Sequence, residues 1–269
     1  MHSNALAFSP IGSRRSTQRF GVSERQYTRT NSIMATLLII GRRQRLCLIA
    51  ALGTIVACAG PASADDAAAE DQRPLSPAQV ALFETPHLQN VGQVETLDYK
   101  IVRDGPGGFT DKVALHVRGL HADGTKDLSF DFLTGERRVA YPELDNFRAN
   151  PLLMLVLERD VLEMKATLGV SATYFRNEIR QSFVDRATIV DSEFALDGKA
   201  IPVKLLSVHP FANDTRLEHL PTVQSKAYLF VLSDKVPGMI AEIRIEMPGN
   251  DEQNIPAVAE RITFQGVEP

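Results

Sequence analysis

The chain has 269 residues, with 29 Lys and Arg against 33 Asp and Glu. Eight of the basic residues and one acid precede residue 65, so residues 65–269 carry 21 bases and 32 acids, a formal net charge of −11. So acidic a segment repels nucleic acid and anionic lipid head groups, so we expect neither as a partner. Both cysteines, Cys47 and Cys58, also precede residue 65, which excludes disulfides and thiol chemistry in the rest of the chain.

Residues 34–64 have the features of a secretory signal peptide. Three arginines precede an apolar run that ends at Cys58, and Ala62-Ser63-Ala64 provides a small-residue cleavage site. The run is shorter than the roughly 20 residues that a membrane span requires. We therefore expect a periplasmic or secreted protein, with no integral membrane span once the leader is removed.

A second processing route is open within the same leader. Residues 55–58 resemble a bacterial lipobox, in which the cysteine is lipidated after cleavage. The alternative location is therefore a lipid anchor through Cys58. Residues 1–33 are interpreted as an upstream or disordered extension, residues 65–75 as an acidic disordered tether, and residues 76–269 as one exported domain.

Two helices are predicted near the middle of this domain. Asn150 and Pro151 suit a helix start, and Gly169 suits its end. Between them, apolar residues recur at the three- and four-residue spacing of one helix face. Ser171 can cap a second helix. Ser76-Pro77 repeats the start signal, so Pro77–Phe83 is a further short helix.

The rest of the domain alternates in the manner of half-buried strands joined by tight turns. Four strands are expected before the helices, the last over Arg137–Tyr141, and the Asp123-Gly124 pair predicts a hairpin within them. A hairpin around Asp197-Gly198 follows the helices, with Pro202 placing its second strand at an edge or bulge. Phe211–Val223 is expected to be a loop. The remaining strands are expected at Lys226–Leu232, Met239–Met247 and Arg261–Val267.

These elements predict an α+β fold. About nine strands form a curved antiparallel sheet, a half-barrel or open barrel, and the inserted helical pair covers its concave face. Leu152–Leu157 is apolar nearly all round, as expected for a helix enclosed by such a sheet.

The element order resembles that of the periplasmic half-barrel proteins that carry or sense lipoproteins. A short helix, a meander, a helical pair and a second meander follow one another over most of residues 76–267, without a shared motif. The resemblance implies an open cup plugged by helices, with a lipid or lipoprotein as its partner.

No nucleotide, cofactor, metal or nucleophile motif is present in the sequence, and no catalytic residue is assigned. The leading hypothesis is a non-enzymatic envelope protein that binds an apolar ligand or an envelope partner between sheet and helices. The candidate apolar lining is Met154, Leu157, Val161, Met164, Phe175 and Ile243. Arg176 and Arg180 are candidate polar contacts, able to grip a carboxylate or phosphate group or to pair with Glu158 or Asp160.

Two alternatives stay open. One is a structural or assembly module whose helices fill the core. The other is an exported hydrolase that uses Asp160 or Glu163 on the central helix, which requires both acids to be exposed in a concave site. An ordinary ion pair between Arg159 and Glu163, four residues apart, is the competing interpretation of that acidic cluster.

Overall fold

Nine antiparallel strands form one open sheet in the computed structural model, which describes residues 74–251 and 256–269. The predicted leader, the tether up to residue 73 and Cys58 lie outside the described residues. The strands are β1 (Glu95–Asp104), β2 (Phe109–Leu120), β3 (Lys126–Phe132), β4 (Leu144–Phe147), β5 (Thr188–Leu196), β6 (Lys199–Val208), β7 (Ala227–Leu232), β8 (Ile240–Met247) and β9 (Val258–Glu268). The predicted α+β class with about nine strands is confirmed.

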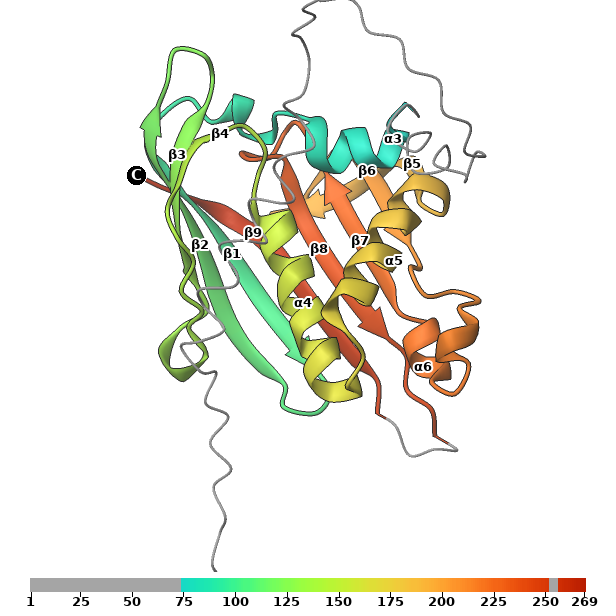
Figure 1. The fold of residues 1–269 in the computed structure, drawn as a ribbon. Coiled ribbons are helices and arrows are strands. Elements are labelled where there is room, and N and C mark those ends of the chain that lie inside the picture. The colour runs from blue at the N-terminus through green and yellow to red at the C-terminus, as the bar shows by residue number, and fades with distance from the viewer. Residues whose placement is uncertain (1–73, 252–255) are drawn as a thin grey trace, which may run out of the picture. The chain divides into compact units, whose positions relative to one another are not determined.

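The strand order explains where the helices have to lie. It runs β4-β3-β2-β1-β9-β8-β7-β6-β5, so the sheet consists of two meanders joined by the pairing of β1 with β9. The helices α4 (Leu152–Leu168) and α5 (Ala172–Asp185) follow β4 at one edge and precede β5 at the other. The chain therefore crosses a face of the sheet between its two edges, and the helical pair covers that face (Figure 1).

Local signals fix the ends of the two helices as expected. The Asn150 side chain accepts the Leu152 N–H at 3.1 Å, and α4 begins one residue later than Pro151. Gly169 ends α4 with a φ of +70°, a left-handed conformation that glycine adopts without strain. The Ser171 side chain accepts the Tyr174 N–H and so caps α5.

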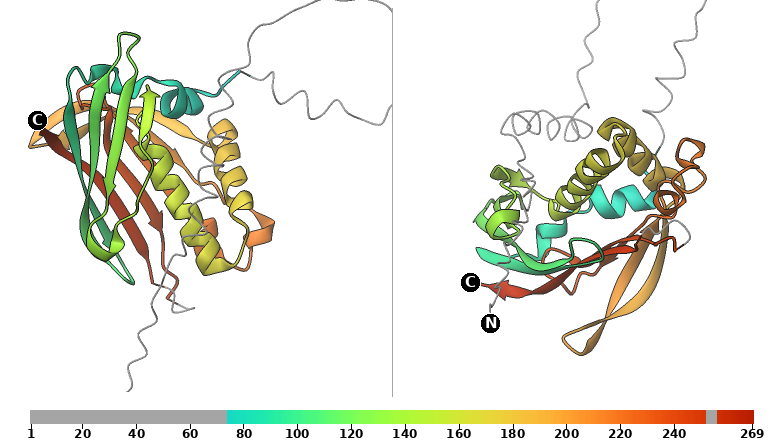
Figure 2. Two further views of the ribbon diagram at one scale, coloured as in Figure 1. Left: turned by 60° about the vertical axis from the view of Figure 1, so that its left-hand side comes forward. Right: turned by 90° about the horizontal axis from the view of Figure 1, so that it is seen from below.

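The core lies between the helices and the face that they cover (Figure 2). Leu152, Leu153, Leu155 and Val156 at the start of α4 are at most 1% exposed, which confirms the enclosed helix start. From α5, three residues at helical spacing face the same core, and all are buried: Phe175, Ile179 and Phe183. On the sheet side, β1 contributes alternate buried residues and β9 contributes Ile262 and Phe264.

A short helical segment closes one end of this core. It comprises α3 (Pro77–Gln79), with Ser76 and Gln79 forming a reciprocal capping box, and a π-helical turn over Val80–Glu84. The Ser76 hydroxyl donates to the Phe183 carbonyl and so ties this segment to α5. A 3-10 turn over His87–Asn90 then leads into β1.

The fourth strand is not where the sequence analysis placed it. The expected strand over Arg137–Tyr141 is replaced by a 3-10 turn, Gly135–Arg137, and a single bridge between Phe132 and Val139. The chain turns away because Leu133 has a φ of +63°, which ends β3. Pairing resumes only at β4, four residues long.

Two expectations after the helices also differ. Strand β6 is interior, because β7 covers its outer side from Lys204 to Val208. Pro202 is tolerated there because it lies beyond the end of β7, so its missing N–H costs no bond to that strand. The expected loop over Phe211–Val223 contains a 3-10 turn, Thr215–Leu217, and the start of the short helix α6 (Pro221–Gln224).

Candidate functional site

A row of side chains crosses four strands beneath the second half of α4. By cross-strand register, Arg103 of β1 faces Glu260 of β9, Glu260 faces Ile245 of β8, and Ile245 faces Tyr228 of β7. The next row inward is apolar, with Ile101, Ile262, Ile243 and Phe230 in register. The apolar face of the sheet therefore becomes polar at this end.

Helix α4 supplies three charged side chains above that row. Asp160 accepts hydrogen bonds from Lys226 Nζ at 2.6 Å and from the Tyr228 hydroxyl at 2.5 Å. Glu163 forms a two-point ion pair with Arg103. Arg159 pairs with Glu260, whose other carboxylate oxygen lies 3.7 Å from Arg103.

The expected pair between Arg159 and Glu163 is therefore wrong. The two residues are four apart on α4, but each reaches a partner of opposite charge on the sheet instead of the other. Partners on a neighbouring element prevail here because they are less exposed to water: the Glu260 side chain is 4% exposed and that of Arg103 is 16% exposed. The cluster thus joins α4 to β1 and β9.

Burial and ion pairing shift the pKa values in this cluster. Burial raises the pKa of Glu260, although Arg159 and Arg103 oppose the shift. Burial beside Asp160 raises the pKa of Tyr228 well above its usual value. At Glu163 burial acts upward, but the hydrogen bond and charge of Arg103 prevail and lower the pKa.

These contacts remove the basis for the hydrolase alternative. It requires Asp160 and Glu163 to be exposed in a concave site, yet Asp160 is 6% exposed and both acids are ion-paired. Each carboxylate is committed to holding a cation that is itself partly or fully buried. Both acids serve as counter-ions, so neither is poised for proton transfer. We call the whole cluster the ionic floor; its residues are Arg103, Arg159, Asp160, Glu163, Lys226 and Glu260.

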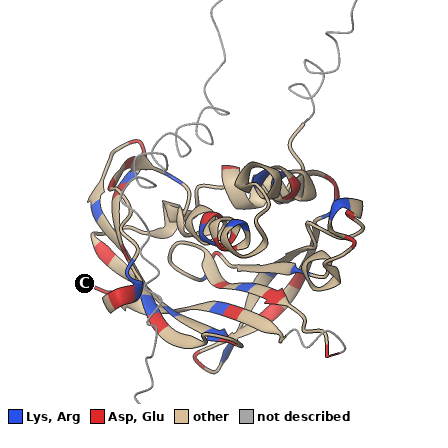
Figure 3. Ribbon diagram, turned by 60° about the horizontal axis from the view of Figure 1, so that its bottom comes forward, with Lys and Arg blue, Asp and Glu red and all other residues tan. Residues whose placement is uncertain are grey.

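A pocket of about 390 Å³ opens beside this cluster and is lined by residues from the last turns of α4 and from α6. Figure 1 shows the end of α4 and α6 at the same end of the sheet. Its volume falls near the lower end of the range of small-molecule sites. By surface area most of its wall is apolar, and the apolar lining residues are Pro106, Met164, Leu168, Leu220, Val223, Ile245, Met247 and Val258. Its charged lining is Arg103, Asp160, Glu163, Lys226 and Glu260. In the view from this end, charged residues occur on the helices and on the strands facing them (Figure 3).

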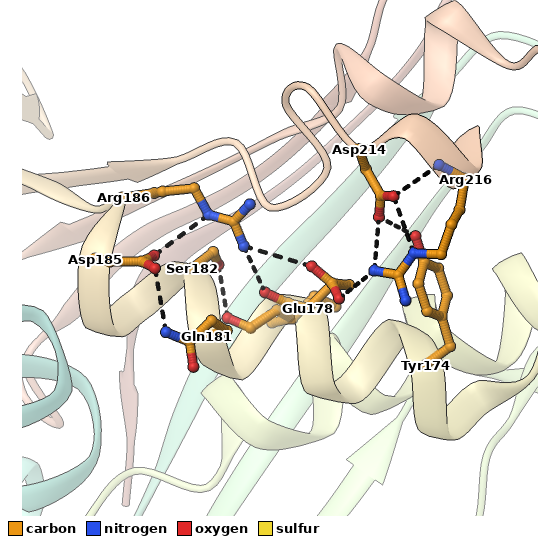
Figure 4. Close-up of polar contacts among 9 residues, drawn as sticks. Tyr174, Glu178, Gln181, Ser182, Asp185, Arg186, Asp214 and Arg216 are labelled. Atoms are coloured by element: carbon orange, nitrogen blue, oxygen red, sulfur yellow. Dashed lines mark hydrogen bonds and ion pairs between the residues drawn. The ribbon is translucent and has the colours of Figure 1, made fainter. Parts of the chain in front are cut away.

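One wall of the pocket is a segment anchored on α5. Leu220, Thr222 and Val223 follow Asp214 and Arg216, which contact α5 (Figure 4). The Tyr174 hydroxyl donates to Asp214, and Arg216 pairs with Glu178 at 2.6 Å. The Arg216 guanidinium also lies 4.3 Å from the centre of the Tyr174 ring, a cation–π contact. We call residues 211–226 the strap.

The candidate lining residues divide between pocket and core. Met164 lies on the pocket wall, and Met154 is half-buried away from it. The other four are packed in the core and line no part of the pocket: Leu157, Val161, Phe175 and Ile243. These four side chains are enclosed by the helices and the sheet and are therefore not open to the pocket.

The two candidate arginines lie elsewhere on α5. Arg176 forms a two-point ion pair with Glu158 of α4, the helix-to-helix pairing that the sequence offered as one option. Arg180 is exposed. Neither lines the pocket, so neither is placed to contact a ligand there.

The ionic floor was not predicted from the sequence, although the sequence contains a signal for it. Arg103 continues the inward series Leu97, Tyr99 and Ile101, and Lys226 continues the inward series of β7. Glu260 likewise precedes the buried pair on β9. Each of the three is a charged residue at an inward position of an alternating strand. Such positions on three strands, at one end of the sheet, indicate a buried ionic cluster.

Within residues 74–251 and 256–269, no group of three or more His, Cys, Asp and Glu side chains is placed to hold a metal ion. None of the helices in these two ranges combines the length and the apolar character of a membrane span.

The fold and the site define an α+β protein with an open, helix-covered sheet and a pocket between apolar wall and ionic floor. No protein-family model matches the sequence, and no curated protein matches it. Among solved structures, a chain from the complex structure of Pseudomonas aeruginosa MucA/MucB is similar, with 11% identity and a TM-score of 0.32. The match covers 68% of this chain and 54%, about half, of that one. A likeness at this level carries no argument for function.

Proposed function

We propose that the domain is an exported, non-enzymatic binding protein that holds the apolar part of a ligand in the pocket between α4, the strap and the sheet. The observation that carries the proposal is the apolar wall of that pocket, which surrounds a space of about 390 Å³ beside buried ion pairs. A space of this size accommodates one small ligand or the end of one chain, and burial of apolar surface supplies the affinity.

Two sequence features support the same proposal. The predicted signal peptide directs the domain to the cell envelope, where lipids and lipoproteins are abundant partners. The order of elements resembles half-barrel proteins that carry or sense lipoproteins, in which a ligand between sheet and helices is expected. The ionic cluster does not favour an enzyme, because its acids serve as counter-ions for Arg103, Arg159 and Lys226.

The test uses the neutral apolar dye N-phenyl-1-naphthylamine and two pocket-filling variants, Leu168→Trp and Met247→Trp. Both positions are half-buried on the pocket wall, so an indole there occupies the space. The matched control is Leu162→Trp, because Leu162 lies on the same helix and is 43% exposed. The chain contains no Trp, so the emission of the introduced indole also reports whether it enters the pocket.

We expect the wild-type protein and the control to bind the dye alike, and both pocket variants to bind it at least about tenfold more weakly. Equal binding by all four proteins, or no binding by the wild type, contradicts the proposal. Such a result would favour the alternative of an assembly module whose helices serve only to complete the core.

A further inference from the structure

We infer that the pocket selects an amphiphile whose polar head carries no net charge, such as an acylglycerol or an acylamide, over a fatty acid or an alkylamine with the same chain. This inference rests on the proposed function, and it names the ligand class of the same pocket. The charges at the pocket floor and their pairing determine which head group fits.

The charges of the cluster balance. Three carboxylates meet three cations, and every carboxylate has a cationic nitrogen within 4 Å: Asp160 with Lys226, Glu163 with Arg103, and Glu260 with Arg159 and Arg103. Arg159 pairs with Glu260 and is not part of the pocket lining. Counted with Arg159, the cluster is therefore neutral as a whole, although each group in it is charged.

A charged head would upset that balance in a place that water screens poorly. The side chains of Asp160, Lys226 and Glu260 are less than a tenth exposed. A carboxylate placed beside them would bring a charge without a counter-ion, and so would an ammonium group. Either head would leave one unbalanced charge in this poorly screened place, which is costly because a buried charge without a counter-ion is not compensated.

A neutral head finds partners on the same floor. The Lys226 ammonium has three N–H donors, and among the described residues only its hydrogen bond to Asp160 is formed. The Oε2 atom of Glu260 is buried and accepts no hydrogen bond from any of the described residues. A hydroxyl or amide group supplies both an acceptor and a donor, so it can satisfy both kinds of atom without adding charge. The apolar wall then takes its chain.

The experiment compares three probes with one medium-length alkyl chain, each below its micelle concentration: a monoacylglycerol, the fatty acid and the alkylamine. Displacement of N-phenyl-1-naphthylamine from the purified wild-type protein at neutral pH ranks them. We expect the monoacylglycerol to displace the dye at a concentration about tenfold lower than either charged probe.

Two charge variants turn this ranking into a stricter test. Glu163→Gln leaves Arg103 in excess, so the fatty acid should gain about tenfold relative to the monoacylglycerol. Lys226→Met leaves Asp160 without its cation, so the alkylamine should gain instead. Glu163 has a side chain that is 40% exposed, so its variant keeps the test informative if Lys226→Met does not fold.

The possible failures can be told apart. If a charged probe binds the wild type as tightly as the monoacylglycerol, or if Glu163→Gln leaves the ranking unchanged, the inference on the head group is wrong while the pocket proposal stands. If no probe binds, or if Leu168→Trp weakens the binding of none of them, the proposed function fails and the inference fails with it.

Discussion

The Lys226 ammonium and the Asp160 carboxylate form a buried ion pair, with Nζ 2.6 Å from Oδ1 and both side chains less than a tenth exposed. This contact joins the residue before β7 to the middle of α4. Asp160→Ala should destabilise the fold by about 3–5 kcal/mol, because it leaves Lys226 and the Tyr228 hydroxyl buried without their acceptor. Chemical unfolding at neutral pH measures the change.

The control for that prediction removes the charges together. Replacing Asp160 by Leu, Lys226 by Met and Tyr228 by Phe leaves no buried polar group from this contact, so most of the lost stability should return. If the triple variant is no more stable than Asp160→Ala, the contact stabilises the fold by itself and the cost does not come from orphaned groups.

Packing of α4 against the sheet should be strongest on its inner side. Leu157 is 9% exposed, and Leu157→Ala should cost about 2–5 kcal/mol because a cavity replaces part of an enclosed side chain. Leu162→Ala on the same helix, at a position 43% exposed, should change the free energy of unfolding by about 0.5 kcal/mol or less. Equal effects of the two substitutions in urea unfolding would mean that the helix does not close the core.

The turn before β8 depends on a glycine. Gly238 has a φ of +73°, and a Cβ there would lie 2.7 Å from Leu97 Cδ1 and 2.9 Å from Asn150 Nδ2. Gly238→Ala should therefore cost roughly 2–5 kcal/mol, from backbone strain and from crowding together. Gly124→Ala separates the two effects, because Gly124 has a φ of +84° with no atom within 4 Å of a Cβ. Its cost should be about 1–2 kcal/mol in the same unfolding assay.

A buried histidine should make stability fall in mild acid. His87 is fully buried, with Nε2 2.8 Å from the Ala81 carbonyl and Nδ1 3.4 Å from the Asn150 N–H, so the neutral ring satisfies both contacts. Burial lowers its pKa below the usual value of 6.5. As the pH falls, the unfolded chain therefore takes up a proton at His87 before the folded protein does. The stabilising contribution of His87 is complete above pH 6.5 and declines as the pH falls from there towards the folded pKa.

The measurement compares the wild type with His87→Gln, which cannot titrate, by chemical unfolding at about pH 7.5 and about pH 5.5. The stability advantage of the wild type should shrink on going to the lower pH, by at most about 1.4 kcal/mol per pH unit. An advantage that stays constant or grows would show that His87 is not the group responsible.

The anchor of the strap should affect local opening more than global stability. The Arg216 side chain is 60% exposed, so Arg216→Gln should change the free energy of unfolding by less than about 1 kcal/mol. Hydrogen exchange at Leu217–Gln224 should nevertheless become faster, because the contacts to Tyr174 and Glu178 are lost. Lys204→Gln, which breaks an exposed pair with Asp191, should leave those amides unchanged.

The regular elements could be predicted from sequence because their signals are local. Gly169 and Ser171 mark the helix ends, and the alternation in β8 and β9 sets their inward faces. The expected strand over Arg137–Tyr141 was misplaced because a positive φ at Leu133 is not visible in residue type. Such a backbone conformation depends on the surrounding chain.

The ionic floor was harder to predict for a different reason. Arg103, Asp160 and Glu260 are separated by long stretches of sequence and meet only through the pairing of β1 with β9 and the path of α4 across them. Local spacing instead suggested that Arg159 would bind Glu163. The choice among counter-ions is made by tertiary structure, because burial strengthens the distant pairs more than helix spacing favours the near one.

The central position of β9 has a consequence for how the protein is made. Strand β9 is the last of the nine in sequence, yet it provides the hydrogen-bonded link between β1 and β8. During synthesis, β1–β4 and β5–β8 emerge before β9, so the edges of β1 and β8 that pair with β9 have no partner strand until residues 258–268 arrive. The final folding step is then a long-range closure, which is slow and exposes strand edges meanwhile. A chaperone that shields these edges would act on this intermediate.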